Sequence, residues 1–520
     1  MQRFCEDCGS PLSPGMAFCE NCGAKIDTEE SAAPAPGSLI QAVKDSARPP
    51  LTQTGMSSPM PAGSEQGIIY TNLKLLCAQL PAEESAVRQL LDGFIADASA
   101  RGISYTLMDV SPRFSGTGTV AEHVAVIRGE VEKSHAKYLL ILGSSSVIPT
   151  MVWTNEAGDK LSDKDVASDL PYSTLDTASP FGGQRYDFDE VLRTGRLPNV
   201  SLATYFNSLK AGCGMAESVE SFAMSTEDWK NETQDIYKNI SAQDVLTSPE
   251  CKRNDVTSMI PAGTNVFLFN LHGSNWTEFW YGQRGSSYPE ALAPTSFGGM
   301  AKPYFVTVEA CYGAAYEGRK ADKSVLLSAL GGKCISFLGS SRIAFGSPSA
   351  PGCCADIICC EHLKGICSGM TAGDSLALAR KTLMKDDADA ETIKTLAEFS
   401  LYGDPSARLL GTGARKSFFA SRTADKSFAK GIRIPQPDVR RAVRTELCAV
   451  EKRISDAVEA AVYGKYPELA GCKAQFWRNA NSGAVSAVFS KQQGQESPVA
   501  QIVAVSLGAG GQIQKIMESK

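Results

Sequence analysis

The sequence contains no run of about 18 consecutive apolar residues, the length that a membrane-spanning helix needs. Its start also lacks the apolar core of a signal peptide, because a cysteine motif begins at Cys5. We therefore expect a cytoplasmic protein with no membrane span. A formal net charge of −6 over 520 residues argues against a large nucleic-acid-binding surface. The length is sufficient for two or three domains.

Cysteine is abundant, with 16 residues, but its placement is not typical of a disulfide framework. Adjacent cysteines such as Cys353 and Cys354 are poorly spaced for a conventional disulfide bond. Five cysteines crowd one expected helix and its end: Cys353, Cys354, Cys359, Cys360 and Cys367. This distribution favours a reducing compartment.

Residues 1–26 carry two Cys-x-x-Cys pairs. Cys5 and Cys8 form the first pair and Cys19 and Cys22 the second, with ten residues between them. Four thiolates are a ligand set that zinc prefers, and so short a segment cannot fold without such a staple. The pattern resembles the short zinc ribbons that begin many bacterial proteins. Redox motifs or disulfides are the alternatives, although no thioredoxin-like context surrounds the pairs. We expect a structural zinc ion at these four residues.

Residues 27–66 are rich in Ala, Pro, Ser, Gly, Gln and Thr and have almost no aromatic residues. Such a composition cannot bury enough apolar surface to fold, so it predicts a flexible linker. We expect the ribbon to be tethered to the rest of the chain.

From residue 67 to about 415 the pattern alternates between strand-like and helical segments. Apolar residues recur at helical spacing over 87–95, whereas 103–110 and 138–142 are strand-like. This alternation predicts an α/β sandwich with a largely parallel sheet.

Residues 416–520 follow a different pattern. A long apolar stripe predicts a helix from about 437 to 463. Alternating segments bounded by turn residues predict four antiparallel strands, at 474–479, 484–490, 499–507 and 512–517. We interpret this region as a small α+β domain without a catalytic constellation, with a binding or packing role.

Two apolar runs end in polar residues capable of chemistry. The run 266–271 leads into His272 and Gly273, and the run 304–308 leads into the segment that holds Cys311. Runs of apolar and β-branched residues bounded by a turn are typical of buried parallel strands, and active sites lie beyond the carboxyl ends of such strands. A cysteine nucleophile and a histidine base could therefore face each other from neighbouring strands.

These two motifs, in this order, resemble the clan of cysteine peptidases that includes caspases, legumains and gingipains. The gingipain family fits best because of four further segments. Residues 142–144 with 148–149 resemble its early strand and loop. Residues 168–172 resemble its S-D-x-x-Y motif, 195–197 its G-R-[LIF] segment and 401–409 its closing L-x-G-D-P-S-x-R-L signature. The resemblance covers roughly residues 67–412. It implies a caspase-like α/β/α sandwich and a cysteine-type endopeptidase acting on proteins or peptides.

The resemblance also implies roles for individual residues. Cys311 is the expected nucleophile, and His272 would protonate the leaving amine and then activate water. The amides of Gly273 and Cys311 could hold the developing oxyanion. Asp169 matches the carboxylate that orients the histidine, and its alternative is to brace the loop in which it lies.

The specificity pocket is open to two interpretations. Arg342, on the loop 339–345 after a strand, could pair with an acidic side chain. Asp169, Asp176 or Asp187 could instead line the pocket and favour a basic side chain. We favour a charged or polar side chain recognised by Arg342, because Asp169 cannot both orient His272 and serve the pocket.

Two other classes of function remain. The chain could be a catalytically idle scaffold whose ribbon and C-terminal domain bind protein partners. Nucleic-acid binding through the ribbon is disfavoured, because the ribbon carries few cations.

Overall fold

The computed structural model describes residues 3–4, 11–12, 64–181, 186–349, 352–384, 388–411, 445–480, 482–491 and 498–520. The chain divides into two compact units, Met1–Gly55 and Met56–Lys520. In the first unit, β1 (Arg3–Phe4) pairs antiparallel with β2 (Pro11–Leu12). The four cysteines of the expected zinc ribbon, and the expected linker up to residue 63, lie outside the described residues.

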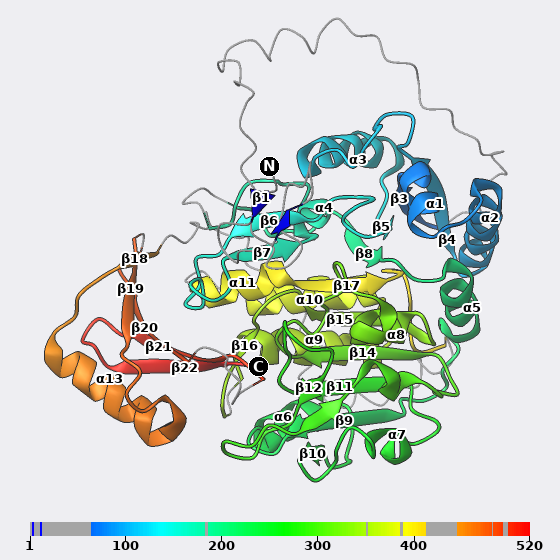
Figure 1. Ribbon diagram of the computed structural model, residues 1–520. Helices are drawn as coiled ribbons and strands as arrows, with labels where there is room; N and C mark the ends of the chain where they lie inside the picture. Colours follow the sequence, from blue (N-terminus) through cyan, green and yellow to red (C-terminus); the bar gives the residue numbers. More distant parts are fainter. Residues whose placement is uncertain are drawn as a thin grey trace, which may run out of the picture. The chain divides into compact units, whose positions relative to one another are not determined.

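A ten-stranded sheet organises the second unit (Figure 1). Its strand order is β10-β9-β11-β14-β15-β17-β8-β5-β3-β4. The strands are β3 (Glu65–Thr71), β4 (Ile103–Asp109), β5 (Tyr138–Leu142), β8 (Arg193–Leu197), β9 (Ser221–Thr226), β10 (Leu246–Ser248), β11 (Val266–Asn270), β14 (Tyr304–Glu309), β15 (Cys334–Ser340) and β17 (Phe399–Gly403). The first of these strands starts at Glu65, two residues before the expected start of the domain.

The sheet consists of two parallel halves that run in opposite directions. Among its described strands, β15 and β17 form an antiparallel pair and the other neighbours are parallel. β11 and β14 are neighbours in the same half, so their carboxyl ends open on the same edge of the sheet. The expectation of a largely parallel sheet is therefore confirmed.

Helices cover both faces of the sheet. On β14, the hydroxyl of Thr307 contacts Nδ1 of His362 at 3.1 Å, and His362 lies on α9 (Cys354–Cys367). Tyr304 points to the opposite face, where its ring stacks against Phe297 of η1 (Pro294–Phe297). Both faces of the strand are thus buried, which explains its run of apolar and β-branched residues. The expected α/β/α sandwich is confirmed.

The remaining helices of this region surround the sheet. They are α1 (Leu73–Gln79), α2 (Glu84–Ala100), α3 (Val120–Ser134), α4 (Leu170–Thr174), α5 (Leu202–Gly212), α6 (Lys230–Tyr237), α7 (Val256–Met259), α8 (Val325–Leu330), α10 (Ala372–Leu383) and α11 (Ala390–Glu398). Local signals set several boundaries. The side chain of Thr119 accepts a hydrogen bond from the amide of Glu122, whose carboxylate accepts one from the Thr119 amide, and this capping box starts α3. No helix in the described part of the chain is both long and apolar enough to cross a membrane.

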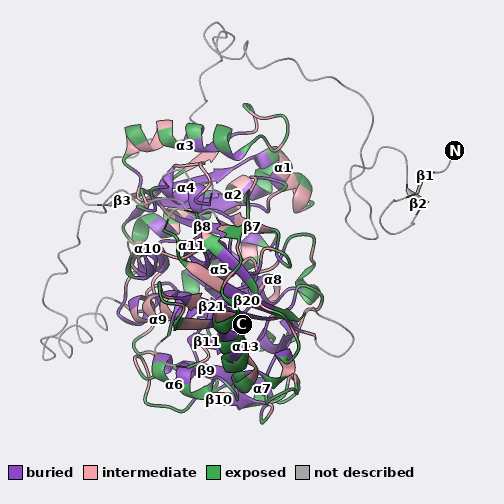
Figure 2. Cartoon of the chain, turned by 90° about the vertical axis from the view of Figure 1, so that its left-hand side faces the viewer, coloured by how far each residue is buried: buried purple, intermediate pink, exposed green. Residues whose placement is uncertain are grey.

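The C-terminal region forms a six-stranded antiparallel sheet of order β16-β22-β21-β20-β19-β18. Its elements are β18 (Thr445–Leu447), α13 (Lys452–Lys465), β19 (Gln475–Asn479), β20 (Val485–Lys491), β21 (Gln501–Leu507) and β22 (Ile513–Ser519). The four expected strands are present. Figure 2 shows that α13 is largely exposed, with Val458 and Val462 among its buried residues.

The expected helix start at 437 is wrong in its described part. Residues Thr445–Leu447 form a strand because they pair with β19, and the helix begins at Lys452. Residues 437–444 lie outside the described residues.

The edge strand β16 (Phe345–Gly346) belongs to the loop that follows β15. It pairs with β22, the last strand of the chain. The C-terminal sheet is therefore continuous with a segment next to the expected active site.

Candidate active site

The structure brings Cys311, His272 and Gly273 together at one edge of the large sheet. In the parallel register, Asn270 on β11 lies beside Glu309 on β14, so His272 and Cys311 follow at the same level. A Cβ atom added to Gly273 would lie 1.6 Å from the carbonyl oxygen of Cys311. A residue without a side chain is required there, because the two turns touch through their backbones.

A sharp turn follows Cys311. Tyr312 has a positive φ of 52°, which a bulky residue adopts only when its surroundings impose it. The amide of Tyr312 donates to the carbonyl of Arg342 at 2.7 Å, and the amide of Gly313 donates to Ala310 at 3.0 Å. These bonds fix the position of the thiol at the end of the strand.

The Cys311 thiol is almost completely covered, with 2% of the residue exposed. Its S–H donates to the carbonyl of Ala344 at 3.6 Å. Burial raises the pKa of the thiol, so the sulfur is protonated in this arrangement. Many of the apolar residues that pack with it come from the C-terminal sheet, namely Trp477, Val488, Ile502, Ala504 and Met517.

His272 is held by Gln283. Nε2 of the imidazole donates to the side-chain oxygen of Gln283 at 2.7 Å. The amide nitrogen of Gln283 donates to the carbonyl of Gly285 at 3.0 Å, which fixes the orientation of the amide group. Nδ1 has no hydrogen-bond partner among the described residues and remains available as a base. Burial lowers the pKa of His272 to about 4; the bond to Gln283 opposes this shift and the charge of Lys520 adds to it.

Asp169 lies elsewhere, and its expected pairing with His272 is wrong in this structure. Its two carboxylate oxygens accept bonds of 2.6 and 2.7 Å from the guanidinium of Arg196 on β8. Arg196 is fully buried and also donates to the carbonyls of Gly143 and Ile148, both at 2.9 Å. A buried arginine needs all of these partners, so Asp169 braces the sheet.

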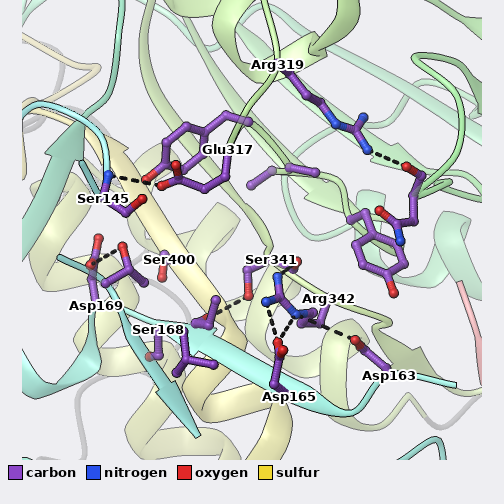
Figure 3. Close-up of a pocket in the computed structure, with 18 of the residues that line it drawn as sticks. Ser145, Asp163, Asp165, Ser168, Asp169, Glu317, Arg319, Ser341, Arg342 and Ser400 are labelled. Carbon is purple, nitrogen blue, oxygen red and sulfur yellow. Dashed lines mark hydrogen bonds and ion pairs between the residues drawn. The ribbon is translucent and has the colours of Figure 1, made fainter. Parts of the chain in front are cut away.

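Arg342 is paired with carboxylates. Its Nε donates to Asp165 at 2.7 Å and lies 3.6 Å from Asp163. These residues line a cavity of about 420 Å³, with Asp169 also on its wall (Figure 3). The guanidinium is already neutralised by two carboxylates, so it is not free to recognise an acidic substrate.

Three buried carboxylates surround the side chain of Lys520. Glu232 comes from the first turn of α6, Glu309 ends β14, and Asp356 is in the first turn of α9. Their oxygens lie within 4.8 Å of one another. We call these three residues the acidic trio. The ammonium of Lys520 lies 3.5 Å from an oxygen of each of them and donates to the carbonyl of Ser347 at 3.1 Å.

Trp229 joins the acidic trio to the histidine. The Lys520 ammonium lies 4.2 Å from the centroid of the Trp229 ring, a cation–π distance. The same indole is 4.3 Å from the imidazole of His272, centroid to centroid. The lysine side chain is thus enclosed by one aromatic face and three carboxyl groups.

The backbone of Lys520 contacts the nucleophile directly. The amide of Cys311 donates to the carbonyl oxygen of Lys520 at 2.8 Å, and the amide of Lys520 donates to Ala344 at 3.0 Å. Gly346 forms the wall beside the lysine side chain. A Cβ atom there would lie 2.1 Å from Cε of Lys520 and 2.7 Å from an oxygen of Glu309.

Several of these residues carry no local signal in the sequence. Glu309 is the exception, because it stands two positions before Cys311 in the segment that the sequence already marks. Glu232, Asp356 and Lys520 come from segments far apart in the chain, and they meet through the tertiary fold and the C-terminal sheet. Gln283 likewise has no distinctive sequence context. It lies in the loop between β12 (Trp280–Tyr281) and β13 (Glu290–Leu292), and this hairpin places it next to His272.

Comparisons with known proteins place this chain in a family. The model of peptidase family C25 matches residues 98–410, more than half of the chain. No curated protein matches the sequence. A crystal structure of gingipain R, described as an Arg-specific cysteine proteinase, aligns with a TM-score of 0.48 at 11% identity and covers 89% of this chain and 93% of its own. On the strength of the family match, the chain belongs to peptidase family C25, the gingipain family, and is a cysteine-type endopeptidase.

Proposed function

We propose that Cys311 is the nucleophile and His272 the general base and acid of this endopeptidase. The shared edge of β11 and β14 and the free Nδ1 of His272 support these roles. The thiol proton passes to His272, and the thiolate attacks the carbonyl carbon of the substrate. The carbon–nitrogen bond then breaks and the amine leaves with the proton from His272. Water, activated by the same imidazole, hydrolyses the thioester and restores the thiol.

The amide of Cys311 supplies one donor for the oxyanion. Its bond to the Lys520 carbonyl supports this role, because a substrate carbonyl in the same place would receive the same donor. Gly273, whose backbone touches that of Cys311, is the proposed source of a second donor. Gln283 is a positioning residue that keeps the Nε2 proton in place and leaves Nδ1 basic.

The proposed specificity is for lysine before the scissile bond. The observation that carries it is the side chain of Lys520, which lies in the acidic trio while its own carbonyl binds the Cys311 amide. Burial raises the pKa values of Glu232 and Glu309, and a substrate ammonium stabilises their ionised forms, so the pocket favours a substrate that supplies an ammonium. We therefore propose a basic substrate side chain, in place of the charged or polar side chain recognised by Arg342 that the sequence favoured.

Matched peptides test this function. Peptides that differ at one position, carrying lysine, norleucine or glutamate, are offered to the chain with Lys520 deleted and to the same chain with Cys311→Ala. We expect hydrolysis after lysine by the first protein and none by the second. Norleucine has the same length without the charge, so comparable cleavage after it would refute the role of the acidic trio.

We further propose a structural zinc ion in the first unit. Cys5, Cys8, Cys19 and Cys22 have the spacing of a closed zinc site, in which no position is left for substrate. A protein partner is the proposed ligand of this ribbon.

A further inference from the structure

The last strand of the chain is seated as a peptide in the proposed substrate site. β22 pairs antiparallel with β16, with Phe345 beside Ser519 and Gly346 beside Glu518. β16 is an edge strand next to the nucleophile, and addition of an extended peptide to an edge strand is a common mode of peptide recognition. The pairing fixes the depth to which Lys520 enters the site.

Residue 520 stands where the residue before a scissile bond belongs. Its carbonyl oxygen accepts the Cys311 amide at 2.8 Å, and its amide donates to Ala344 at 3.0 Å. Its ammonium has no exposed surface and lies 3.5 Å from each member of the acidic trio. Backbone and side chain therefore occupy together the positions that a lysyl substrate needs.

The rest of the C-terminal domain covers the thiol from outside. Met517 on β22 and Ile502 and Ala504 on β21 belong to the apolar cluster that contains Cys311. The hydroxyl of Ser519 accepts a bond from the amide of Ile502 and donates to the carbonyl of Ala500, so the end of β22 is also tied to β21. A substrate cannot reach Cys311 until these residues move away.

We propose that residues 513–520 are a built-in inhibitor that occupies the substrate site of the same chain. This inference rests on the proposed function, in which the acidic trio receives the lysine of a substrate. An intramolecular ligand acts at an effective concentration on the order of millimolar or more, so a free peptide competes poorly with it. The apparent affinity for substrate is reduced by the fraction of molecules in which β22 has left the site.

Two changes at the end of the chain test the inhibitor. Lys520→Glu adds a carboxylate to the acidic trio, and deletion of residue 520 removes the ammonium while β22, which ends at Ser519, keeps its full length. Lys452→Glu is the matched control, because this lysine is in the same domain and 87% of its side chain is exposed. The probe is iodoacetamide. Peptide mass spectrometry identifies the alkylated cysteines and gives the rate at which Cys311 reacts.

We expect Cys311 to react at least about tenfold faster in both altered chains than in the unaltered chain or the control. Cys334, fully buried on β15, reports folding and should stay protected in all four proteins. The catalytic efficiency on a lysyl peptide should rise in parallel, mainly through a lower KM. If Cys311 is alkylated at the same rate in all four proteins while Cys334 stays protected, the proposal of a built-in inhibitor is refuted. If Cys311 reacts faster in the two altered chains but none of the four proteins hydrolyses the peptide, residues 513–520 still cover the thiol and the proposed function is refuted.

Discussion

Nε2 of His272 donates a 2.7 Å hydrogen bond to the side-chain oxygen of Gln283, where a carboxylate had been expected. A neutral amide orients the imidazole but adds no negative charge beside it. His272 therefore stays easily deprotonated, in agreement with the pKa of about 4 that its burial produces. The carboxylate of the S-D-x-x-Y motif has a structural role instead, as the partner of Arg196.

Two replacements of Gln283 separate its effect on the orientation of the His272 imidazole from the effect of charge beside the ring. Gln283→Ala should lower kcat on the order of 10–10² with little change in KM, because the imidazole loses its fixed tautomer. Gln283→Glu keeps the bond and adds a negative charge, which raises the pKa of His272. The acid limb of the kcat profile should then move to higher pH. Both variants are measured in the chain lacking residue 520, and an unmoved limb in Gln283→Glu would contradict the role of Gln283.

Gly346→Val should close the lysine pocket. The first added carbon already overlaps Cε of Lys520, so a branched side chain excludes any lysine. We expect the efficiency on lysyl peptides to fall on the order of 10²-fold. The thiol should become easier to alkylate, because the inhibitory lysine is expelled as well. Gly129→Val on α3, where an added Cβ atom meets nothing within 4 Å, is the control; retained lysyl cleavage by Gly346→Val would show that the pocket lies elsewhere.

The lysine preference should strengthen as the pH rises. Burial raises the pKa of Glu232 to about 8, and the charge of Lys520 acts in the opposite direction. A lysine side chain binds best to the ionised carboxylate, so KM for a lysyl peptide should fall between about pH 7 and 9. KM for the norleucine peptide should not follow, and Glu232→Gln should remove the difference. A lysyl KM that is flat over this range would contradict the assignment.

The same shift has a consequence for stability. Because the pKa of Glu232 is raised above its usual value of 4.5, the folded chain holds a proton that the unfolded chain releases. Its stabilising contribution is complete below the unfolded pKa and is lost as the pH rises through the folded pKa. Denaturant titrations should show this loss in the unaltered chain and a smaller loss in Glu232→Gln.

The ribbon should carry one zinc ion per chain. Metal analysis of the purified protein gives the zinc stoichiometry. Cys19→Ser should abolish zinc binding, whereas Cys77→Ser should leave it unchanged. A chelator should not reduce peptide hydrolysis, since all four expected ligands lie in the first unit. Zinc that persists in Cys19→Ser would place the metal elsewhere.

The sequence was sufficient to predict the fold and to predict that His272 and Cys311 follow strands that end at one edge of the sheet. Runs of apolar and β-branched residues marked β11 and β14, and the residues after them could be placed because parallel neighbouring strands end at the same edge. The C-terminal strands were equally visible from their alternation. Such patterns of apolar residues can be recognised in a sequence because buried positions recur with the period of the helix or strand.

The partners of the site residues could not be predicted in the same way. Asp169 was assigned to His272 by its motif, yet a fully buried Arg196 takes both of its oxygens. Arg342 stood on the expected loop but points to Asp163 and Asp165. Whether a charged side chain serves a pocket or a brace depends on which opposite charge the fold brings near, and sequence spacing does not carry that information.

Covalent labelling identifies the nucleophile and the preferred substrate side chain in one experiment. A lysyl acyloxymethyl ketone is reacted with the chain lacking residue 520, and the adduct is mapped by mass spectrometry. We predict a single adduct on Cys311, its absence in Cys311→Ala, its persistence in Cys213→Ala, and much slower reaction with the glutamyl reagent. An adduct on another cysteine, no adduct at all as the idle-scaffold alternative predicts, or a preference for the glutamyl reagent would contradict the account.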